Sequence, residues 1–221
     1  MSKLLVIEGA DGAGKATQTK LLVERLRSEG YVVESIDFPR YESNHFGKLI
    51  RECLDGKRGD FMKLDPRITS TLYAADRFES SKQIKQWLNE GKIVVADRYV
   101  SANMLHQGAK LTDEDEREEF LVWLDKIEHG VFELPRPDSI LYLEIPYETR
   151  KDMMGSDRDR EGLDVSETDA DHQAMTEQSA RTLVASLNVW RPILCVADGS
   201  LRTREDIHQD VYLAVVDVIK N

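Results

Sequence analysis

The chain contains few cysteines, no long apolar run and no surplus of basic residues among its 221 residues. Its two cysteines, Cys53 and Cys195, stand far apart and outside any CxxC pair, so the sequence predicts neither a disulfide framework nor a zinc site. The 41 acidic residues outnumber the 30 lysines and arginines, which gives a formal net charge of −11. This balance argues against a general binder of DNA or RNA, because neutralising phosphates requires a basic surplus.

Long hydrophobic segments are equally scarce. The longest early apolar run, from Leu4 to Ile7, ends at Glu8 and is too short for the core of a secretory signal. No stretch approaches the ~20 apolar residues of a membrane span. We therefore expect a cytoplasmic protein whose partners include neither a membrane nor a nucleic acid.

Five short apolar or β-branched runs recur along the chain, at residues 3–8, 32–37, 93–97, 139–145 and 193–197. Segments with helical spacing of apolar residues separate them; examples are Leu22 and Leu26, and later Ile207, Val211, Val215 and Val218. Strands that alternate with helices predict the α/β class, with a five-stranded parallel sheet covered by helices on both faces. Since no linker or repeat divides the chain, we expect one domain over residues 1–221.

Two polar segments depart from this pattern. Residues 112–119 hold six acids among eight residues, and with Thr112 as the N-cap they predict the exposed start of a helix. Residues 155–171 contain two arginines among seven acids. A polar loop of this length inside a compact domain is typical of a functional lid, so we expect a mobile lid at about residues 150–171.

The strongest motif is Gly9-Ala-Asp-Gly-Ala-Gly14-Lys15, which follows the first predicted strand and precedes a helix. Its G-x-x-x-x-G-K spacing is typical of a phosphate-binding loop, in which backbone N–H groups and a helix N-terminus surround phosphate oxygens. Lys15 would reach the β- and γ-phosphates of a nucleotide. The alternative is a glycine-rich turn with a surface lysine, and the strand–loop–helix context argues against it.

The loop departs from the motif at Ala16, where a serine or threonine hydroxyl usually coordinates Mg²⁺. Thr17 offers a hydroxyl one residue later, but one step along a helix turns a side chain by ~100°. Either Mg²⁺ is held by other oxygens, such as carboxylates acting through water, or catalysis is impaired. The sequence leaves both possibilities open.

A second candidate site follows the third predicted strand. Asp97 and Arg98 stand at its carboxyl end, which is the edge of an open α/β sheet where ligands bind. A carboxylate there can orient Mg²⁺ and its waters, and an arginine can bind a phosphate through two hydrogen bonds. Such pairs also serve as structural caps, but the nearby phosphate-binding motif favours a functional reading.

With these residues in place, the chain resembles the thymidylate kinases, which are nucleoside monophosphate kinases of the P-loop group. The resemblance runs nearly from end to end, and its marks are Glu8-Gly-Ala-Asp-Gly-Ala-Gly-Lys15, Phe38-Pro-Arg-Tyr41, Leu72-Tyr-Ala-Ala-Asp-Arg77, Asp97-Arg-Tyr99 followed by Asn103 and Gln107, and Asp164-x-x-Glu167. It implies a three-layer α/β/α P-loop NTPase fold and ATP-dependent phosphorylation of thymidine monophosphate with Mg²⁺. It also implies a homodimer, with residues 66–89 as the expected interface.

The resemblance implies roles for individual residues. The catalytic residues would be Lys15, Asp11, Arg98 and Arg158, and Mg²⁺ would lie near Asp97, Asp11 and Thr17. ATP would bind Gly9, Ala10, Asp11, Gly12, Ala13, Gly14, Lys15, Ala16 and Thr17. Thymidine monophosphate would bind Asp11, Phe38, Arg40, Tyr41, Tyr73, Arg77, Arg98, Asn103, Gln107 and Glu167. Without the resemblance, ordinary core packing would be the simpler reading of Phe38 and Tyr73.

The resemblance also implies a source of positive charge at the transferring phosphate. The family takes this charge either from a basic residue within the phosphate-binding loop or from the lid. Because Gly12 occupies the loop position, we expect the lid to supply it through Arg158, with Arg160 beside it. The alternative is that these two arginines only offset neighbouring acids on a solvated loop.

We expect Arg158→Ala to lower kcat by at least ~10²-fold with only a modest change in nucleotide affinity, because the contact would form in the transition state alone. Steady-state kinetics with ATP as the varied substrate would measure both quantities. An unchanged kcat would remove Arg158 from the mechanism.

Two other functions stay open at this point. The chain could be a kinase for another nucleoside monophosphate or for a deoxynucleoside, although Phe38, Arg77 and the pair Asn103 and Gln107 argue against this. It could also be a nucleotide-binding protein with weakened transfer, which Ala16 and the few basic residues of the lid would favour. A panel of acceptors separates these functions.

Overall fold

Five parallel strands form the central sheet of the computed structural model, which describes residues 2–156 and 170–220. The strands are β1 (Lys3–Glu8), β2 (Val33–Asp37), β3 (Ile93–Asp97), β4 (Ser139–Glu144) and β5 (Trp190–Leu194). They pair in the order β2-β3-β1-β4-β5, so β1 lies at the centre and the phosphate-binding motif begins where it ends. The predicted five-stranded parallel sheet is thereby confirmed.

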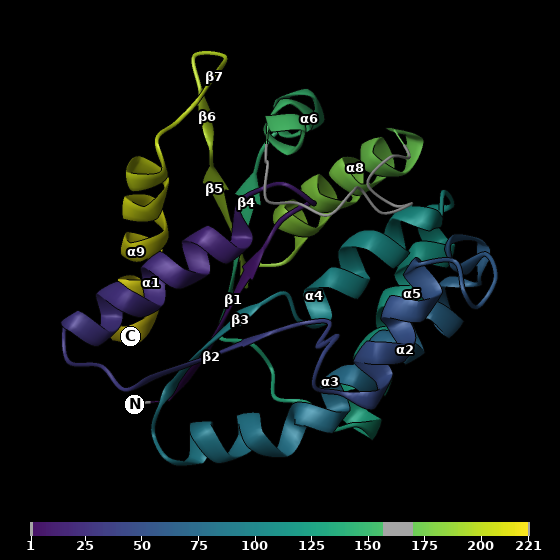
Figure 1. Cartoon of the computed structure of the whole chain (residues 1–221), viewed down its shortest axis with the longest axis horizontal. Coiled ribbons are helices and arrows are strands. Elements are labelled where there is room, and N and C mark those ends of the chain that lie inside the picture. The colour runs from purple at the N-terminus through teal and green to yellow at the C-terminus, as the bar shows by residue number, and fades with distance from the viewer. Residues whose placement is uncertain (1, 157–169, 221) are drawn as a thin grey trace.

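Helices cover both faces of this sheet (Figure 1). One face carries α1 (Lys15–Ser28) and α9 (Arg204–Lys220), and the other carries α3 (Pro66–Asn89), α4 (Val100–Ala102), α5 (Glu114–Asp125) and α8 (Ala170–Ser186). Two further helices, α2 (His45–Leu54) and α6 (Tyr147–Ser156), lie toward the rim. Within residues 2–156 and 170–220 there are also four short helical turns, η1 (Phe61–Lys63), η2 (Asn103–Gln107), η3 (Gly108–Lys110) and η4 (Lys126–Val131). The three-layer α/β/α prediction is confirmed.

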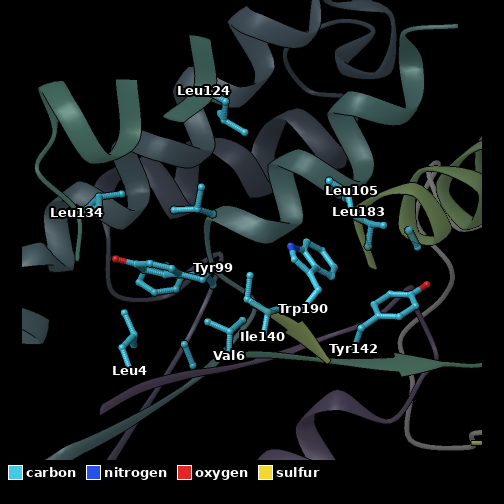
Figure 2. Packing of buried hydrophobic residues seen from close by; sticks show 14 of the residues in the cluster. Leu4, Val6, Tyr99, Leu105, Leu124, Leu134, Ile140, Tyr142, Leu183 and Trp190 are labelled. Carbon is cyan, nitrogen blue, oxygen red and sulfur yellow. The ribbon is translucent and has the colours of Figure 1, made fainter. Parts of the chain in front are cut away.

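Alternation along the strands divides the core into two clusters. In β1, Leu4 and Val6 point into the cluster under α3 and α8, whereas Leu5 and Ile7 point toward α1 and α9. All four are fully buried, as expected for a central strand of a parallel sheet with helices on both faces. Figure 2 shows the first cluster, where the rings of Tyr142 and Trp190 are 6.0 Å apart.

The fifth strand lies three residues before the run that predicted it. We expected a strand at residues 193–197, but β5 spans Trp190–Leu194, and Val196–Ala197 (β6) instead pairs antiparallel with Ser200–Leu201 (β7). Pro192 lies within β5. Since β5 is an edge strand, the missing N–H of Pro192 costs the sheet no interior hydrogen bond.

The acidic segment after residue 111 also differs in detail. The helix α5 begins at Glu114, and its N-cap is Asp113, whose carboxylate accepts a hydrogen bond of 2.9 Å from the N–H of Glu116. The prediction of Thr112 as the cap was therefore wrong by one residue. Both side chains can cap a helix, and their order in the sequence does not decide between them.

Gly47 in α2 lies against the loop that carries Phe38 and Arg40. A Cβ atom at this position would stand 2.1 Å from the carbonyl oxygen of Arg40 and 3.0 Å from Oδ1 of Asp76. Backbone atoms must shift to relieve such a contact, so we expect Gly47→Ala to lower the free energy of unfolding by about 1–3 kcal/mol and Tm by roughly 2–12 °C. Thermal melting measures this change. Gly130→Ala is the matched control because its Cβ would meet nothing closer than 3.9 Å; equal Tm values for the two variants would contradict the prediction.

His208 in α9 makes the stability of the fold sensitive to acid. Burial, helped by the charge of Arg25, lowers the pKa of His208 below its usual 6.5. The unfolded chain therefore binds a proton more readily, so stability is fully present above about pH 6.5 and falls as the pH drops below it. We expect His208→Gln to flatten this dependence between pH 7 and 5. Urea unfolding at several pH values tests this, with the exposed His45→Gln as the control; parallel curves for the wild type and His208→Gln would refute it.

Within the described residues, no helix combines the length and the apolar character needed to cross a membrane.

Candidate active site

The loop after β1 has the conformation of a phosphate-binding loop. Gly12 and Gly14 adopt left-handed φ angles of 78° and 81°, which glycine reaches without a steric penalty. Gly14 caps α1 without a side-chain hydrogen bond. No capping side chain therefore occupies the first N–H groups of α1, which lie at the positive end of the helix dipole. This arrangement suits an anion.

Lys15, the first residue of α1, folds back over this loop. Its ammonium donates to the carbonyl oxygen of Ala10 at 3.0 Å and lies 3.9 Å from Oδ1 of Asp11. Burial, together with the nearby charge of Arg98, lowers the pKa of Lys15 to about 8. A phosphate bound in the loop would add negative charge beside Lys15 and favour its charged form.

Arg98 directly follows β3, at the carboxyl end of the sheet where the phosphate-binding loop also begins. Its backbone adopts φ 65°, and its N–H donates to the carbonyl oxygen of Ile7 at 3.1 Å, which ties it to the end of β1. The guanidinium pairs through Nη2 with Asp11, and Nη1 lies 2.8 Å from Nε2 of His106. A guanidinium fixed on several sides in this way is oriented before a phosphate arrives, which suits bidentate binding.

Glu8 links the loop to Arg98, a role that was not predicted from its place in the motif. Its side chain is fully buried, and Oε1 accepts from the N–H of Gly9 at 3.0 Å and lies 3.4 Å from Nη1 of Arg98. Oε2 accepts from the hydroxyl of Ser101 at 2.7 Å. Burial raises the pKa of Glu8, while the charges of Arg98 and Lys15 oppose that shift. The sequence signal that could have pointed to Glu8 is an acidic residue that ends an apolar strand directly before the loop.

A pocket opens beside Arg98, between the loop after β2 and helix α3. Its lining brings together most residues predicted to bind the acceptor; it consists of Asp11, Phe38, Pro39, Tyr41, Leu54, Met62, Tyr73, Arg77, Arg98, Ala102, Asn103, His106 and Gln107. Phe38 is 5% exposed and packs 6.0 Å from the ring of Tyr99, while Tyr73 packs 6.0 Å from Phe61. Arg40 lies outside this lining, and its N–H donates to Asp76 at 3.0 Å.

The inner wall of this pocket is a buried charge pair. Arg77 donates to the carboxylate of Glu128 through Nε at 2.7 Å and through Nη2 at 2.6 Å. Nδ2 of Asn103 donates to the same carboxylate at 2.8 Å. Glu128 lies in η4, outside every sequence motif, and sequence reasoning missed it.

A larger cavity extends from the other side of Arg98 along the phosphate-binding loop. Its lining includes residues 11–18 of the loop and α1, the carboxylates Asp37 and Asp97, and the residues Leu201, Arg202 and Arg204 near the start of α9. Asp37 and Asp97 are register partners on neighbouring strands. Burial raises the pKa of Asp97, against the opposing charges of Lys15 and Arg98. The two cavities share Asp11, Phe38, Pro39, Tyr41 and Arg98, so they meet at the guanidinium.

Arg150, at the start of the predicted lid, is fully buried behind the loop. Nη1 donates to the carbonyl oxygen of Asp11 at 3.0 Å and to Oε1 of Gln173 at 2.8 Å. Nη2 donates to Glu177 at 3.1 Å. This arginine therefore joins the phosphate-binding loop to α8. The other predicted lid residues, Arg158, Arg160 and Glu167, lie outside the described residues.

Comparison with known proteins matches the chain to one family. The family model described as thymidylate kinase matches residues 7–209. The chain belongs to the thymidylate kinase family. It is therefore a nucleoside monophosphate kinase, and the family uses ATP as its phosphoryl donor. The P-loop fold and the family predicted from the sequence are both confirmed.

Relatives of the family come from all three domains of life. A probable thymidylate kinase of the archaeon Thermococcus onnurineus is 34% identical over 96% of each chain. The thymidylate kinase of Homo sapiens is 36% identical over 64% of this chain and 60% of its own length, and that of Mycobacterium tuberculosis is 33% identical over 61% and 62%. The solved structure of the Candida albicans thymidylate kinase superposes with a TM-score of 0.75 at 26% identity, covering 98% of this chain and 92% of that one.

Proposed function

We propose that the chain transfers the γ-phosphoryl group of ATP to thymidine monophosphate, with ATP in the larger cavity and the acceptor in the pocket beside α3. The observation that carries this proposal is that the two cavities meet at Asp11 and Arg98. Phosphoryl transfer requires donor and acceptor oxygens in line and close together. A cation fixed at the junction of two cavities can contact both reacting groups.

On the donor side, the loop backbone and Lys15 would hold the β- and γ-phosphates. On the acceptor side, Arg98 would bind the phosphate of thymidine monophosphate through its guanidinium fork, while Asp11 keeps that fork aimed at the junction. The transition state carries its charge on the equatorial oxygens of the transferred group. Lys15 and Arg98 both lie beside Asp11, so both would stabilise the charge as it develops.

The acceptor base would lie between Phe38 and Tyr73, with Arg77, Asn103 and Gln107 at its edge. Tyr41 lines the same pocket and would border the sugar and phosphate. We keep Arg40, Glu167 and Arg158 as predicted contacts: Arg40 stands in the chain between Pro39 and Tyr41, which line the pocket, and the other two residues lie outside the described ranges.

The oxygen atoms of the larger cavity fit Mg²⁺. Asp97, Asp11 and Thr17 line it, whereas among the described residues no group of three or more histidine, cysteine or acidic side chains forms a closed metal cage. Mg²⁺ usually binds one or two carboxylates and completes its shell with water and substrate phosphates, so a site built from these oxygens would not require a hydroxyl at Ala16. When bound, the ion would supply charge neutralisation on the phosphates; Asp97 and Asp11 would hold it, with the hydroxyl of Thr17 nearby.

ADP release measured with Mg·ATP and each common nucleoside and deoxynucleoside monophosphate, plus free thymidine, tests the proposal. We expect thymidine monophosphate to give the highest kcat/KM. Preference for another monophosphate or for thymidine would retain the kinase and refute the acceptor assignment. ATP binding without transfer to any acceptor would favour a nucleotide-binding protein with weakened catalysis.

We also retain the homodimer as a proposal. The helix α3 exposes Ile68 and Phe78, which are 56% and 51% accessible in the single chain. Sedimentation equilibrium would measure the mass in solution, and a monomer at micromolar concentration would refute the proposal.

A further inference from the structure

The pair formed by Arg77 and Glu128 lies behind the part of the acceptor pocket that would meet a base. The two side chains are only 2% and 0% exposed, and Asn103 is 2% exposed. Arg77 and Asn103 line the pocket, whereas Glu128 stands behind both of them. Any ligand that reaches this wall therefore meets atoms that Glu128 has already oriented.

The amide of Asn103 has one orientation that its neighbours allow. Nδ2 donates to the carbonyl oxygen of Ser70 at 3.1 Å and to Oε1 of Glu128 at 2.8 Å. A backbone carbonyl cannot donate a hydrogen bond, and a carboxylate paired with a guanidinium only accepts. Exchanging the amide oxygen and nitrogen would set an acceptor against two acceptors. Both N–H groups are therefore committed, and the atom that Asn103 can offer to a ligand is its carbonyl oxygen.

Arg77 is fixed in the complementary sense. Its Nε and Nη2 atoms donate to Glu128, which leaves Nη1 outside the bidentate pair. The groups that these bonds leave for a ligand in the pocket are therefore an N–H donor of Arg77 and the carbonyl oxygen of Asn103. A base complements this wall when it carries a carbonyl group next to a ring N–H. Thymine and uracil have that edge, whereas cytosine presents an amino donor next to an unprotonated ring nitrogen.

We propose that Glu128 is a specificity-determining positioning residue, which fixes Asn103 and Arg77 so that the pocket accepts a carbonyl beside a ring N–H and rejects the cytosine pattern. The inference rests on the proposed function for placing the base of the acceptor in this pocket. Glu128 acts through its two neighbours and touches no substrate atom. Its place outside every sequence motif, in η4 and 51 residues after Arg77, explains why only the fold reveals it.

The carboxylate is essential to this role. An amide at position 128 has one oxygen and one NH₂ group, whereas Arg77 and Asn103 together present donors to both oxygens of Glu128. In either orientation, Glu128→Gln sets an NH₂ group against a donor. In one orientation Asn103 loses the partner that fixes its amide, and in the other Nε of Arg77 faces the NH₂ group. Either way, one of the two groups proposed to contact the base is no longer held in place, and the pocket's distinction between a ring N–H and a ring nitrogen acceptor is weakened.

The experiment compares kcat/KM for dTMP, dUMP, dCMP and dGMP in the wild type, Glu128→Gln and the matched control Glu133→Gln, whose side chain is 77% exposed and pairs with Lys85 at 3.6 Å. We expect the wild type to favour dTMP over dCMP by about 10³-fold or more. Glu128→Gln should reduce this ratio at least tenfold, without changing the KM for ATP by more than about twofold. Glu133→Gln should match the wild type. A reduced activity with an unchanged ratio would leave Glu128 a purely structural role and overturn the inference.

Two further arms keep the outcome decisive. If Glu128→Gln does not fold, as judged by thermal melting, Asn103→Ala removes the acceptor while the pair of Arg77 and Glu128 persists; the ratio should again fall at least tenfold, and an unchanged ratio overturns the inference.

If the wild type prefers dGMP, which also carries a carbonyl beside a ring N–H, the proposed function fails and the role of Glu128 stands. If it prefers dCMP, the role of Glu128 fails. If no acceptor is phosphorylated, equilibrium dissociation constants for the same nucleotides supply the ratios.

Discussion

Replacing Arg98 with alanine is expected to lower kcat/KM for thymidine monophosphate by about 10³-fold or more, while the KM for ATP changes little. The guanidinium lies where the two cavities meet, it is paired with Asp11, and only 14% of its side chain is exposed. An arginine at the transferring group is worth ~10³–10⁵ in rate. Its loss removes both acceptor binding and stabilisation of charge in the transition state.

Two variants sharpen this measurement. Arg98→Lys retains the charge and the Cβ at φ 65° but loses the planar fork, so we expect an intermediate activity. Arg136→Ala removes a surface arginine paired with Asp125 and should leave kcat/KM unchanged. Steady-state assays of ADP release measure all three. A loss below tenfold in Arg98→Ala would show that this arginine does not contact the acceptor phosphate.

Lys15→Met is expected to lower kcat by about 10³-fold, with a smaller loss of ATP affinity. Methionine nearly matches the length and apolar stem of lysine, so the buried side chain keeps its packing while its charge and its hydrogen bond to Ala10 are lost. One preorganised donor to a developing negative charge contributes about 10²–10³ in rate, and a full positive charge in a buried position contributes more.

Lys20→Met is the control for this prediction because Lys20 is an exposed residue of the same helix. Its kcat should equal that of the wild type. Single-turnover kinetics with saturating ATP separates the chemical step from product release. A rate for Lys15→Met within tenfold of the wild type would place Lys15 outside the transition state.

The fold was predictable where burial is uniform along a segment. The runs at residues 3–8 and 93–97 match β1 and β3 at both ends, because strands buried on both faces are apolar throughout. The edge strand β5 does not follow this rule. Only Trp190 and Ile193 are buried along β5, with the less buried Arg191 and Pro192 between them, so the apolar run used to predict it began only at Ile193.

The candidate site also contains residues that could be predicted from the sequence and residues that could not. Residues of the phosphate-binding loop could be predicted because the chemistry lies in one continuous segment, where spacing alone indicates the geometry. The partners Glu128 and Arg150 could not, since they act on residues 51 and 139 positions away. A local pattern carries no information on which distant group a buried charge will meet. Their roles follow from the way η4 and α6 are folded against α3 and the loop.

Glu8 has a consequence for how acceptor choice can change. One carboxylate oxygen faces both the first N–H of the phosphate-binding loop and the guanidinium of Arg98, so a single buried side chain at the end of β1 sets the spacing between the loop and the guanidinium proposed to bind the acceptor phosphate. The groups proposed to meet the edge of the base, by contrast, stand on α3 and η2. Substitutions in those two helices can change which base is recognised, while the separation between the phosphate-binding loop and Arg98 stays the same.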